Sequence, residues 1–417
     1  MNFREFLKII YKKKILHIIG SKVSKNYEAT EISLKIKKPI LFKNINNYKV
    51  ITNLFYSKEI FSILFNIKKE NLLHFLSNKL NNINGSTIIN GSLNLGNLIE
   101  KNIDLYQYPI FKFFKNEGGD GYITSGIVVC KYDGLINASI HRLMVIDKNK
   151  LLIRIIPTRH TYFLFQKASK NKEKLPISIL IGTNPFVMYA CCTRVPISKE
   201  YIFASTLQEK PLELYSCLNG IDVPESEIVM EGFIDPIEKG MEGPFVDITG
   251  TFDNCRMQPV VYIEKIHYRS DPIFQSIIPS STEHCLLMGI PYEAKMFNAI
   301  SDVAIIKNVS LTEGSFFYFN AIVQIKKMNE GDGKNAILAS FSAHPSLKNV
   351  IIVDEDIDIY DYKSIDYAIT TCVNGEKDII IIPNIKGSSL DPTKKSNGTI
   401  TKVGIDATKL LKKEYNK

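Results

Sequence analysis

Four short polar clusters interrupt the apolar strands of the middle of the chain and carry the side chains best suited to chemistry. They are NASIHR (137–142), TRH (158–160), EG (231–232) and EGPFVD (242–247). Each alone is weak evidence, because strand asparagines and lone histidines are more often structural. Together they supply an amide oxygen from Asn137, an imidazole from His160 and a carboxylate from Glu231. Such a set of ligands suits a hard or borderline divalent ion.

The position of His160 favours the neutral form of its ring. Pro157 precedes it by three positions at a predicted helix start. The positive end of a helix dipole disfavours an imidazolium ion. We therefore expect an uncharged imidazole that is able to coordinate a metal.

Alternation of apolar and polar residues predicts the strands that carry these clusters. The runs INASIHRLMVI (136–146) and LLIRIIP (151–157) flank the turn sequence DKNK (147–150), which indicates a hairpin. Successive residues of a strand point to opposite faces. One face of the first strand is expected to carry Asn137, Ser139 and His141, and the other Ile140 and Arg142.

Helix and strand patterns alternate on both sides of this β-rich middle part. FREFLKIIYKKKILHII (3–19) and ENLLHFLSNKLNNI (70–83) predict helices near the N-terminus. Near the C-terminus, KNVIIVD (348–354), SIDYAITTC (364–372) and KDIIIIP (377–383) predict a strand, a helix and a strand that favour parallel pairing. The sequence therefore predicts a mixed α/β (α+β) fold class.

The composition is typical of a folded globular protein. Hydrophobic residues make up 45% and charged residues 23% of 417 positions, which leaves room for two or three domains. The formal charge is +9, but the lysines are scattered, so small anionic substrates are expected and nucleic acid is not. Seven cysteines without CxxC spacing favour a reducing compartment. No run approaches the roughly 18 to 20 apolar residues that span a bilayer.

The order of the motifs along the chain resembles that of UbiD-type decarboxylases. NASIHR, TRH, IGTNP, EIVMEG, EGPFVDITG, IPSSTEH, VDEDIDIYD and KVGIDAT follow one another as in that family, over roughly residues 105–410. The resemblance implies an N-terminal α/β lobe (1–105), a central split-β-barrel domain for flavin and metal (106–305), and a C-terminal α/β lobe with an oligomerisation tail (306–417).

The same resemblance implies a cofactor, prenylated FMN, whose phosphate a manganese-type divalent ion bridges to the protein, often with a potassium ion. The matching ligands of the divalent ion are Asn137, His160 and Glu231. Lys348, just before the strand NVIIV, matches a basic position expected to help bind the cofactor phosphate. The other expected cofactor contacts are Ser139, Ile140, His141, Arg142 and Arg159.

The family chemistry relies on an arginine flanked by carboxylates, and Arg142 matches it. Its guanidinium is expected to hold the substrate carboxylate bidentately over the flavin. Glu283 of SSTEH is expected to protonate the carbon left after CO2 departs; burial would raise its pKa and Arg142 would lower it. Asp247 or Glu242 is expected to complete the hydrogen bonds of the arginine, although an acidic pair around a Gly-Pro sequence is equally typical of a turn.

The chain looks most like archaeal members of the family, some of which convert trans-anhydromevalonate 5-phosphate to isopentenyl phosphate in a mevalonate-type isoprenoid pathway. A cation must then meet the distal phosphate, and the candidates are His141, Arg159 and His284. One alternative is a decarboxylase of 4-hydroxybenzoate-like aromatic acids in quinone synthesis. An alternative of another class is a non-catalytic flavin- or metal-binding subunit, which the presence of Arg142 and Glu283 disfavours.

The resemblance also implies partners. A flavin prenyltransferase would supply the cofactor, and the chain would form a homo-oligomer, either a dimer or a hexamer. With neither a nucleic-acid nor a membrane partner expected, we predict a cytoplasmic protein.

Overall fold

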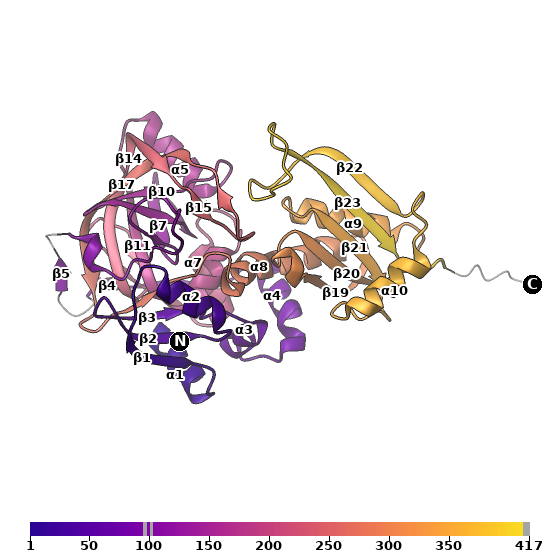
Figure 1. Ribbon diagram of the computed structural model, residues 1–417, viewed down its shortest axis with the longest axis horizontal. Coiled ribbons are helices and arrows are strands. Elements are labelled where there is room, and N and C mark those ends of the chain that lie inside the picture. The colour runs from indigo at the N-terminus through magenta and orange to yellow at the C-terminus, as the bar shows by residue number, and fades with distance from the viewer. Residues whose placement is uncertain (95–97, 101–102, 412–417) are drawn as a thin grey trace, which may run out of the picture. The chain divides into compact units, whose positions relative to one another are not determined.

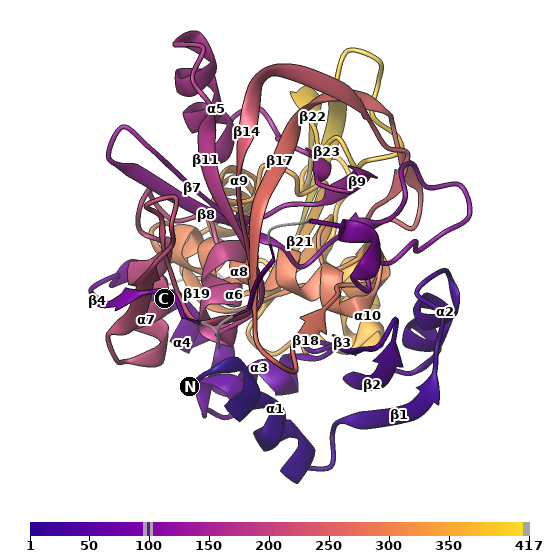
Figure 2. The same cartoon turned by 90° about the vertical axis from the view of Figure 1, so that its left-hand side faces the viewer.

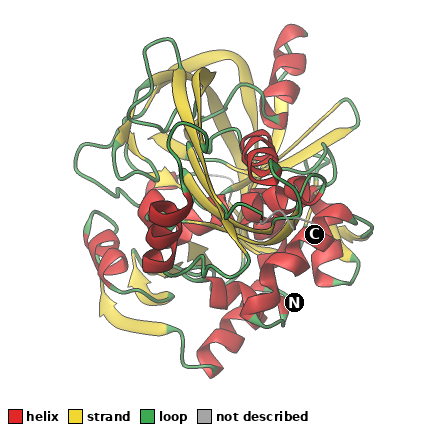
Figure 3. Cartoon of the chain, turned by 90° about the vertical axis from the view of Figure 1, so that its right-hand side faces the viewer, coloured by secondary structure: helices red, strands yellow, loops and turns green. Residues whose placement is uncertain are grey.

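The computed structural model describes residues 1–94, 98–100 and 103–411 and divides into two compact units (Figure 1). Unit 1 comprises residues 1–67 and 82–284, and unit 2 comprises residues 68–81 and 285–417. Both units combine helices with strands (Figure 3). The predicted mixed fold class is therefore confirmed.

Unit 1 begins with a helix whose first turn is fixed by its own sequence. The side chain of Asn2 accepts the N–H of Glu5, and the Glu5 carboxylate accepts the N–H of Asn2, which forms a capping box. The helices that start in unit 1 are α1 (Phe3–Lys12), α2 (Glu28–Lys35), α3 (Lys58–Phe65), α5 (His160–Lys170), α6 (Pro185–Cys192), α7 (Glu200–Gln208) and α8 (Thr282–Ser301), which continues into unit 2.

Three small sheets accompany these helices. The first has the order β1-β2-β3-β18 (His17–Lys22, Ile40–Ile45, Tyr48–Thr52, Ile273–Gln275). The second has the order β13-β12-β4 (Asp222–Val223, Leu212–Ser216, Thr87–Ser92). The third is the pair β15-β16 (Phe245–Val246, Phe252–Asp253).

The main sheet of unit 1 has nine strands, and it positions the candidate site. Its order is β6-β9-β10-β17-β14-β11-β7-β8, with β5 (Leu98–Glu100) paired to β17. The bounds are β6 Tyr122–Ile123, β7 Ile127–Tyr132, β8 Leu135–Ile140, β9 Leu143–Asp147, β10 Lys150–Ile153, β11 Leu175–Thr183, β14 Ser226–Glu242 and β17 Arg256–Tyr268.

This sheet curls round on itself. Strands β8 and β9 lie near opposite ends of the order, yet only His141 and Arg142 separate them along the chain. The three residue steps from Ile140 to Leu143 reach about 10 Å when extended, so these two ends of the sheet must come close together. Within the described residues β8 and β9 do not pair, so the sheet is curled but not closed. We call the gap between the unpaired strands β8 and β9 the split, and Arg142 lies at it.

The expected hairpin is confirmed, but the expected strand before it is divided. Strands β9 and β10 pair with Asp147 opposite Lys150, as the turn sequence predicts. The run predicted as one strand over 136–146 breaks at 141–142, because β8 pairs with β7 whereas β9 pairs with β10 and β6. The same chain segment therefore serves both edges of the split.

Helix α5 packs against the part of the sheet that contains β7, β8, β11 and β14 (Figure 2). Its buried residues recur every three or four positions and form one apolar stripe: Thr161, Leu164, Phe165 and Ala168. This stripe contacts β7, β8, β11 and β14. Burial of the stripe holds the N-terminus of α5, with His160 as its first residue, next to β8.

Unit 2 is a five-stranded sheet with helices. Its order is β19-β20-β21-β23-β22 (Ile305–Leu311, Asn320–Lys326, Asn349–Asp354, Thr399–Ala407, Ile379–Lys386). Strand β21 is paired in parallel with β20 and with β23. The parallel pairing expected of residues 348–354 and 377–383 is wrong, because β23 lies between β21 and β22 and pairs with β22 in the antiparallel direction. Its other helices are α4 (Leu72–Asn81), α9 (Asp332–Ala343) and α10 (Tyr362–Cys372). No helix in the described part of the chain is long and apolar enough to cross a membrane.

Candidate active site

Arg142 lies at the split of the main sheet and is clamped by carboxylates. Its Nε and Nη2 each donate to Glu242 at 2.9 Å, which is a bidentate pair. Nη1 donates to Asp247 at 3.2 Å, and Nη2 also donates to Asp253 at 3.1 Å. The guanidinium carbon lies 4.6 Å from the centre of the Phe245 ring. These four hydrogen bonds and the ring fix the plane of the guanidinium and leave one N–H of Nη1 for another acceptor.

The charge of this cluster is buried. The Arg142 side chain is 9% exposed and Glu242 is 0% exposed. Burial lowers the pKa of Arg142, but the hydrogen bonds and charges of Glu242, with the charges of Asp247 and Asp253, raise it above its usual value. The arginine therefore stays charged at all accessible pH values. A second arginine, Arg256, holds Asp253 bidentately at 2.5 and 2.7 Å.

A second cluster forms where α5 and α7 meet β8. His160 Nδ1 lies 3.6 Å from Oε1 of Glu200, the first residue of α7. The amide nitrogen of Asn137 donates to Ser139 and Thr161 at 3.0 and 2.9 Å, so neither of these bonds uses its carbonyl oxygen. Both α5 and α7 contact β8. An imidazole, a carboxylate and an amide oxygen thus come from three neighbouring elements.

The protonation of this cluster is suited to a cation. Burial lowers the pKa of His160, and Arg194 and Arg159 lower it further, so the ring is neutral. Burial raises the pKa of Glu200 to about 8. A raised pKa means that no nearby cation stabilises the ionised form of this buried carboxylate, and a divalent ion would provide that stabilisation. The described residues contain no group of three His, Cys, Asp or Glu side chains placed to hold a metal. A divalent ion here would therefore need the amide of Asn137 as well.

Glu231, the carboxylate expected in this ligand set, is not brought to it. Asn137 pairs with Cys130, Cys130 with Ile177, and Ile177 with Gly232. Asn137 and Gly232 are therefore three strands apart, about 14 Å at the usual spacing, with side chains on one face. Glu231 precedes Gly232, so it points to the opposite face. The register separates Glu231 from Asn137 by both distance and face.

Glu231 instead forms a buried structural pair. Its carboxylate forms a hydrogen bond with Nε2 of His267 at 2.5 Å. It also accepts hydrogen bonds from the backbone N–H groups of Leu218 and Asn219 at 3.2 and 2.8 Å. Burial raises the pKa of Glu231, but these hydrogen bonds outweigh burial, so the pKa is lowered. The glutamate ties the loop before β13 to the main sheet.

Glu283 is not among the residues that bond to the guanidinium. Its Oε1 accepts the N–H of Phe55 at 3.0 Å, its side chain is fully buried, and burial raises its pKa to about 8. Within the described residues it has no hydrogen bond or ion pair with Arg142. The carboxylates that the structure brings to Arg142 are Glu242, Asp247 and Asp253, the last of which no motif indicated.

The remaining predicted residues fall into two places. Ring nitrogens of His141 bond to the carbonyl of Arg154 at 2.9 Å and to Ser139 and Thr161 at 3.0 and 2.9 Å. Burial lowers the pKa of His141 to about 4, so this ring is uncharged. Ile140 ends β8, and Arg159 precedes α5. Lys348 belongs to unit 2, where Nζ bonds to Thr393 at 2.6 Å and lies 3.2 Å from Asp391.

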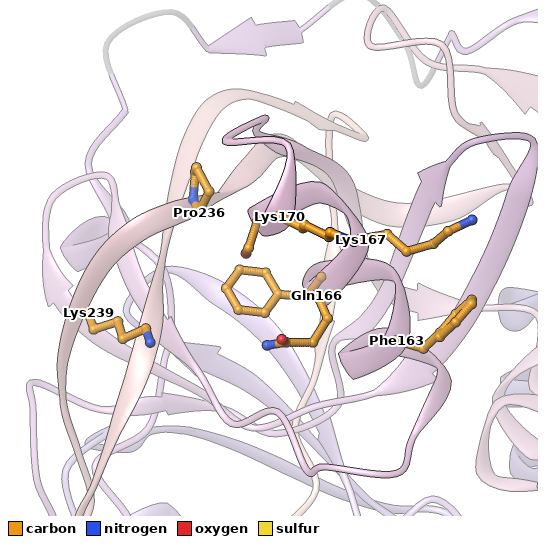
Figure 4. A pocket seen from close by; sticks show the side chains of 8 residues that line it. Phe163, Gln166, Lys167, Lys170, Pro236 and Lys239 are labelled. Atoms are coloured by element: carbon orange, nitrogen blue, oxygen red, sulfur yellow. The ribbon is translucent and has the colours of Figure 1, made fainter.

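Two hollows follow the outer side of α5. One of about 440 Å³ is lined by Thr158, Arg159, His160, Tyr162, Phe163 and Gln166. The other, of about 570 Å³, lies between α5 and the C-terminal half of β14. There Pro236 and Lys239 face Gln166 and Lys170 (Figure 4). The first hollow reaches His160, so it borders the second cluster.

Sequence reasoning missed Glu200, Asp253 and Thr161. Glu200 opens a helix, where an acidic residue is expected for electrostatic reasons alone. Asp253 lies in the short strand β16 and reaches Arg142 only through the pairing of β15 with β16. Neither residue stands out from its neighbours in the sequence.

Comparison with known proteins places this arrangement in a family. Residues 7–80, 91–282 and 285–407 match the N-terminal, Rift-related and C-terminal domains of 3-octaprenyl-4-hydroxybenzoate carboxy-lyase (UbiD). The chain belongs to the UbiD family. It is 47% identical over 416 residues to the anhydromevalonate phosphate decarboxylase of Methanosarcina mazei. This match covers 100% of this chain and 98% of that protein.

Solved structures of the family agree. The UbiD-class enzyme HmfF from Pelotomaculum thermopropionicum, in complex with FMN, matches with a TM-score of 0.93 and 31% identity over 100% of this chain and 96% of that chain. An evolved dimeric form of HmfF with prenylated FMN (prFMN) matches with a TM-score of 0.90 and 30% identity, over 98% and 95%. The resemblance read from the sequence is confirmed.

Proposed function

We propose that the chain is a prenylated-FMN-dependent decarboxylase that converts trans-anhydromevalonate 5-phosphate to isopentenyl phosphate and CO2 in a mevalonate-type isoprenoid pathway. The buried Arg142 cluster carries the proposal, because it presents a fixed cation to a carboxylate substrate. The name of the Methanosarcina mazei relative supports the substrate. The complexes of HmfF with FMN and prenylated FMN support the cofactor.

In this proposal the chain contributes position and charge. The free N–H of Arg142 Nη1 binds the substrate carboxylate, while Glu242 keeps the guanidinium from rotating. Glu283, whose burial raises its pKa to about 8 so that it holds a proton at neutral pH, delivers that proton to the carbon that loses CO2. We prefer Glu283 to Asp247 for this step because Asp247 accepts a hydrogen bond from the Arg142 guanidinium as a carboxylate, whereas only Oε1 of Glu283 is used by the backbone of Phe55.

The second cluster is proposed to hold the cofactor phosphate through a divalent ion such as Mn2+. Asn137, His160 and Glu200 would be its ligands, and the raised pKa of Glu200 is the observation that fits a missing positive charge. K+ would share the phosphate. When bound, prenylated FMN supplies the electron sink for decarboxylation.

We also propose a cytoplasmic homo-oligomer, a dimer or a hexamer, that receives its cofactor from a flavin prenyltransferase. The dimeric form of HmfF supports self-association. The apolar end of the described chain, with Leu410 84% exposed, offers a contact surface for a second copy.

The test is turnover by enzyme produced together with a flavin prenyltransferase, with CO2 and isopentenyl phosphate both measured. Equal molar release of the two products from trans-anhydromevalonate 5-phosphate is the expected result. Parallel reactions with 4-hydroxybenzoate control for an aromatic substrate. Activity on the aromatic acid alone would refute the substrate and keep the reaction, whereas flavin-loaded enzyme inactive on both would refute the function.

A further inference from the structure

Arg154 stands directly opposite Arg142 in the main sheet. Leu143 pairs with Ile153, and the N–H of Arg154 donates to the carbonyl of Arg142 at 3.2 Å, which extends the pairing by one rung. Residues opposite each other in antiparallel strands project from the same face, with Cβ atoms about 5 Å apart. Two guanidinium groups therefore leave the sheet side by side. Like charges in this position destabilise a sheet, so the pair calls for a compensating anion.

The carboxylates of this face are already used by other arginines. Glu242 and Asp247 bond to Arg142, and Asp253 is shared between Arg142 and Arg256. Arg154 Nη1 donates to the carbonyl of Ile155 at 3.1 Å. No carboxylate of the described chain lies within ion-pair distance of Arg154. Arg154 is thus the arginine of this face whose charge is not matched by an ion pair.

The surroundings of Arg154 increase its demand for an anion. Burial lowers its pKa, and the charges of Arg256 and Arg142 lower it further, although Asp253 and Glu242 act in the opposite direction. The carbonyl of Arg154 accepts a ring nitrogen of His141, so its backbone is tied on both sides. A half-buried and anchored guanidinium loses little entropy when it binds a ligand.

We propose that Arg154 binds the phosphate group of the substrate while Arg142 binds its carboxylate. This inference rests on the proposed function and extends it to the recognition of a short acid with a second, phosphate anion. A planar guanidinium donates two parallel N–H groups to a phosphate, and the two adjacent arginines suit a molecule with anions at both ends. The earlier candidate His141 is neutral and has both ring nitrogens engaged.

The first test compares Arg154→Gln with Arg154→Lys in the prenylated-FMN-loaded enzyme. Loss of a charge-assisted phosphate contact should raise KM for trans-anhydromevalonate 5-phosphate by about 10- to 100-fold, with kcat changed by less than about 3-fold. Arg154→Lys should recover part of this loss. Lys150→Gln is the matched control, because Lys150 begins β10, lies four residues before Arg154 and pairs with Glu238. Its KM should equal that of the wild type.

The second test removes the phosphate from the ligand. With the dephosphorylated acid, trans-anhydromevalonate, wild type and Arg154→Gln should give equal kcat/KM, because the interaction partner is gone. An equal loss on both acids would overturn the proposal. The flavin and metal contents of each variant distinguish the other source of phosphate. If Arg154→Gln is folded but emptied of flavin, the residue serves the cofactor phosphate and the proposal is wrong.

A third measurement does not depend on turnover. Titration of inorganic phosphate into the flavin-loaded enzyme should show binding to the wild type and about 10-fold weaker binding to Arg154→Gln. If the wild type turns over neither acid but this difference is present, the proposed function fails and the phosphate site at Arg154 stands. Equal phosphate binding in both proteins would refute the site whatever the turnover. Thermal melting confirms that each variant is folded.

Discussion

Replacing Glu200 or Glu231 by glutamine should change the stability of the metal-free protein in opposite directions. The carboxyl of Glu200 has an ordinary pKa near 4.5 and a folded pKa of about 8. At pH 7 the folded chain must ionise it or hold an extra proton, which costs about 3 kcal/mol. Glu200→Gln removes this cost. The metal-free variant should therefore be more stable than the metal-free wild type by up to about 3 kcal/mol.

Glu231→Gln should act the other way. The substitution disturbs three hydrogen bonds to a buried carboxylate, from His267 and from the backbone of Leu218 and Asn219. A buried donor left without its acceptor costs about 1–3 kcal/mol, so a loss of about 3 kcal/mol or more is expected. The two substitutions thus change the free energy of unfolding in opposite directions, and the two variants should differ by roughly 6 kcal/mol.

The assay is urea unfolding of EDTA-treated protein, followed by circular dichroism because the chain has no tryptophan. The sign of the pH dependence is a second readout. Because the pKa of Glu200 is higher in the folded than in the unfolded chain, the free energy of unfolding falls as the pH rises from about 4.5 through 8. Metal-free wild type should lose stability over this range relative to Glu200→Gln. The two curves should converge at the acid end.

Addition of Mn2+ completes the comparison. A metal at 100 times its Kd stabilises a folded protein by about 2.7 kcal/mol. Wild type and Glu231→Gln should both gain this stability, and Glu200→Gln should not. The opposite pattern, in which Glu231→Gln alone fails to respond to Mn2+, would refute the assignment of Glu200 and restore Glu231 as the ligand.

Three further predictions concern the arginine cluster and the main sheet. Arg142→Lys cannot reproduce the bidentate bond to Glu242, so turnover should fall by about 100-fold with flavin content unchanged; full activity would show that the fork geometry is unimportant. Glu283→Gln should abolish turnover and retain flavin, whereas Asp247→Asn should keep more than about a tenth of the activity, and the reverse order would move the proton transfer to Asp247. At Gly232 an added Cβ would lie 1.9 Å from the carbonyl oxygen of Tyr262, so Gly232→Ala should destabilise unit 1 by about 3 kcal/mol; an unchanged unfolding midpoint would contradict the packing at this bulge.

Elements with a strong local signal could be predicted from the sequence. The capping box at Asn2, the turn after Asp147 and the start of α5 after Pro157 each depend on residues within a few positions of one another. Arg142 was also identified from a local motif. Its third carboxylate, Asp253, reaches it through the pairing of strands more than a hundred residues further along the chain. No local pattern contains that pairing.

The two glutamates show why a ligand set is harder to predict than a strand. In EIVMEG, Glu231 and Gly232 stand together for structural reasons: the glutamate binds His267, and the glycine lets β17 approach at a bulge. The motif therefore looks special without needing a ligand. Glu200 looks ordinary because a glutamate at a helix start has an electrostatic reason to be there. Its chemical role follows only from the packing of α7 on β8, which brings its carboxylate to His160.

The strand register decides between them, and the same reasoning separates the two arginines from their surroundings. A shift by one residue along a strand reverses the face of every side chain, so Glu231 and Gly232 cannot both face Asn137. Equally, Arg154 shares a face with Arg142 only because the hairpin at Asp147 sets residue 153 opposite 143. A one-residue insertion in that turn would move Arg154 to the other face. It should abolish phosphate recognition while leaving the Glu242 and Asp247 contacts of Arg142 in place.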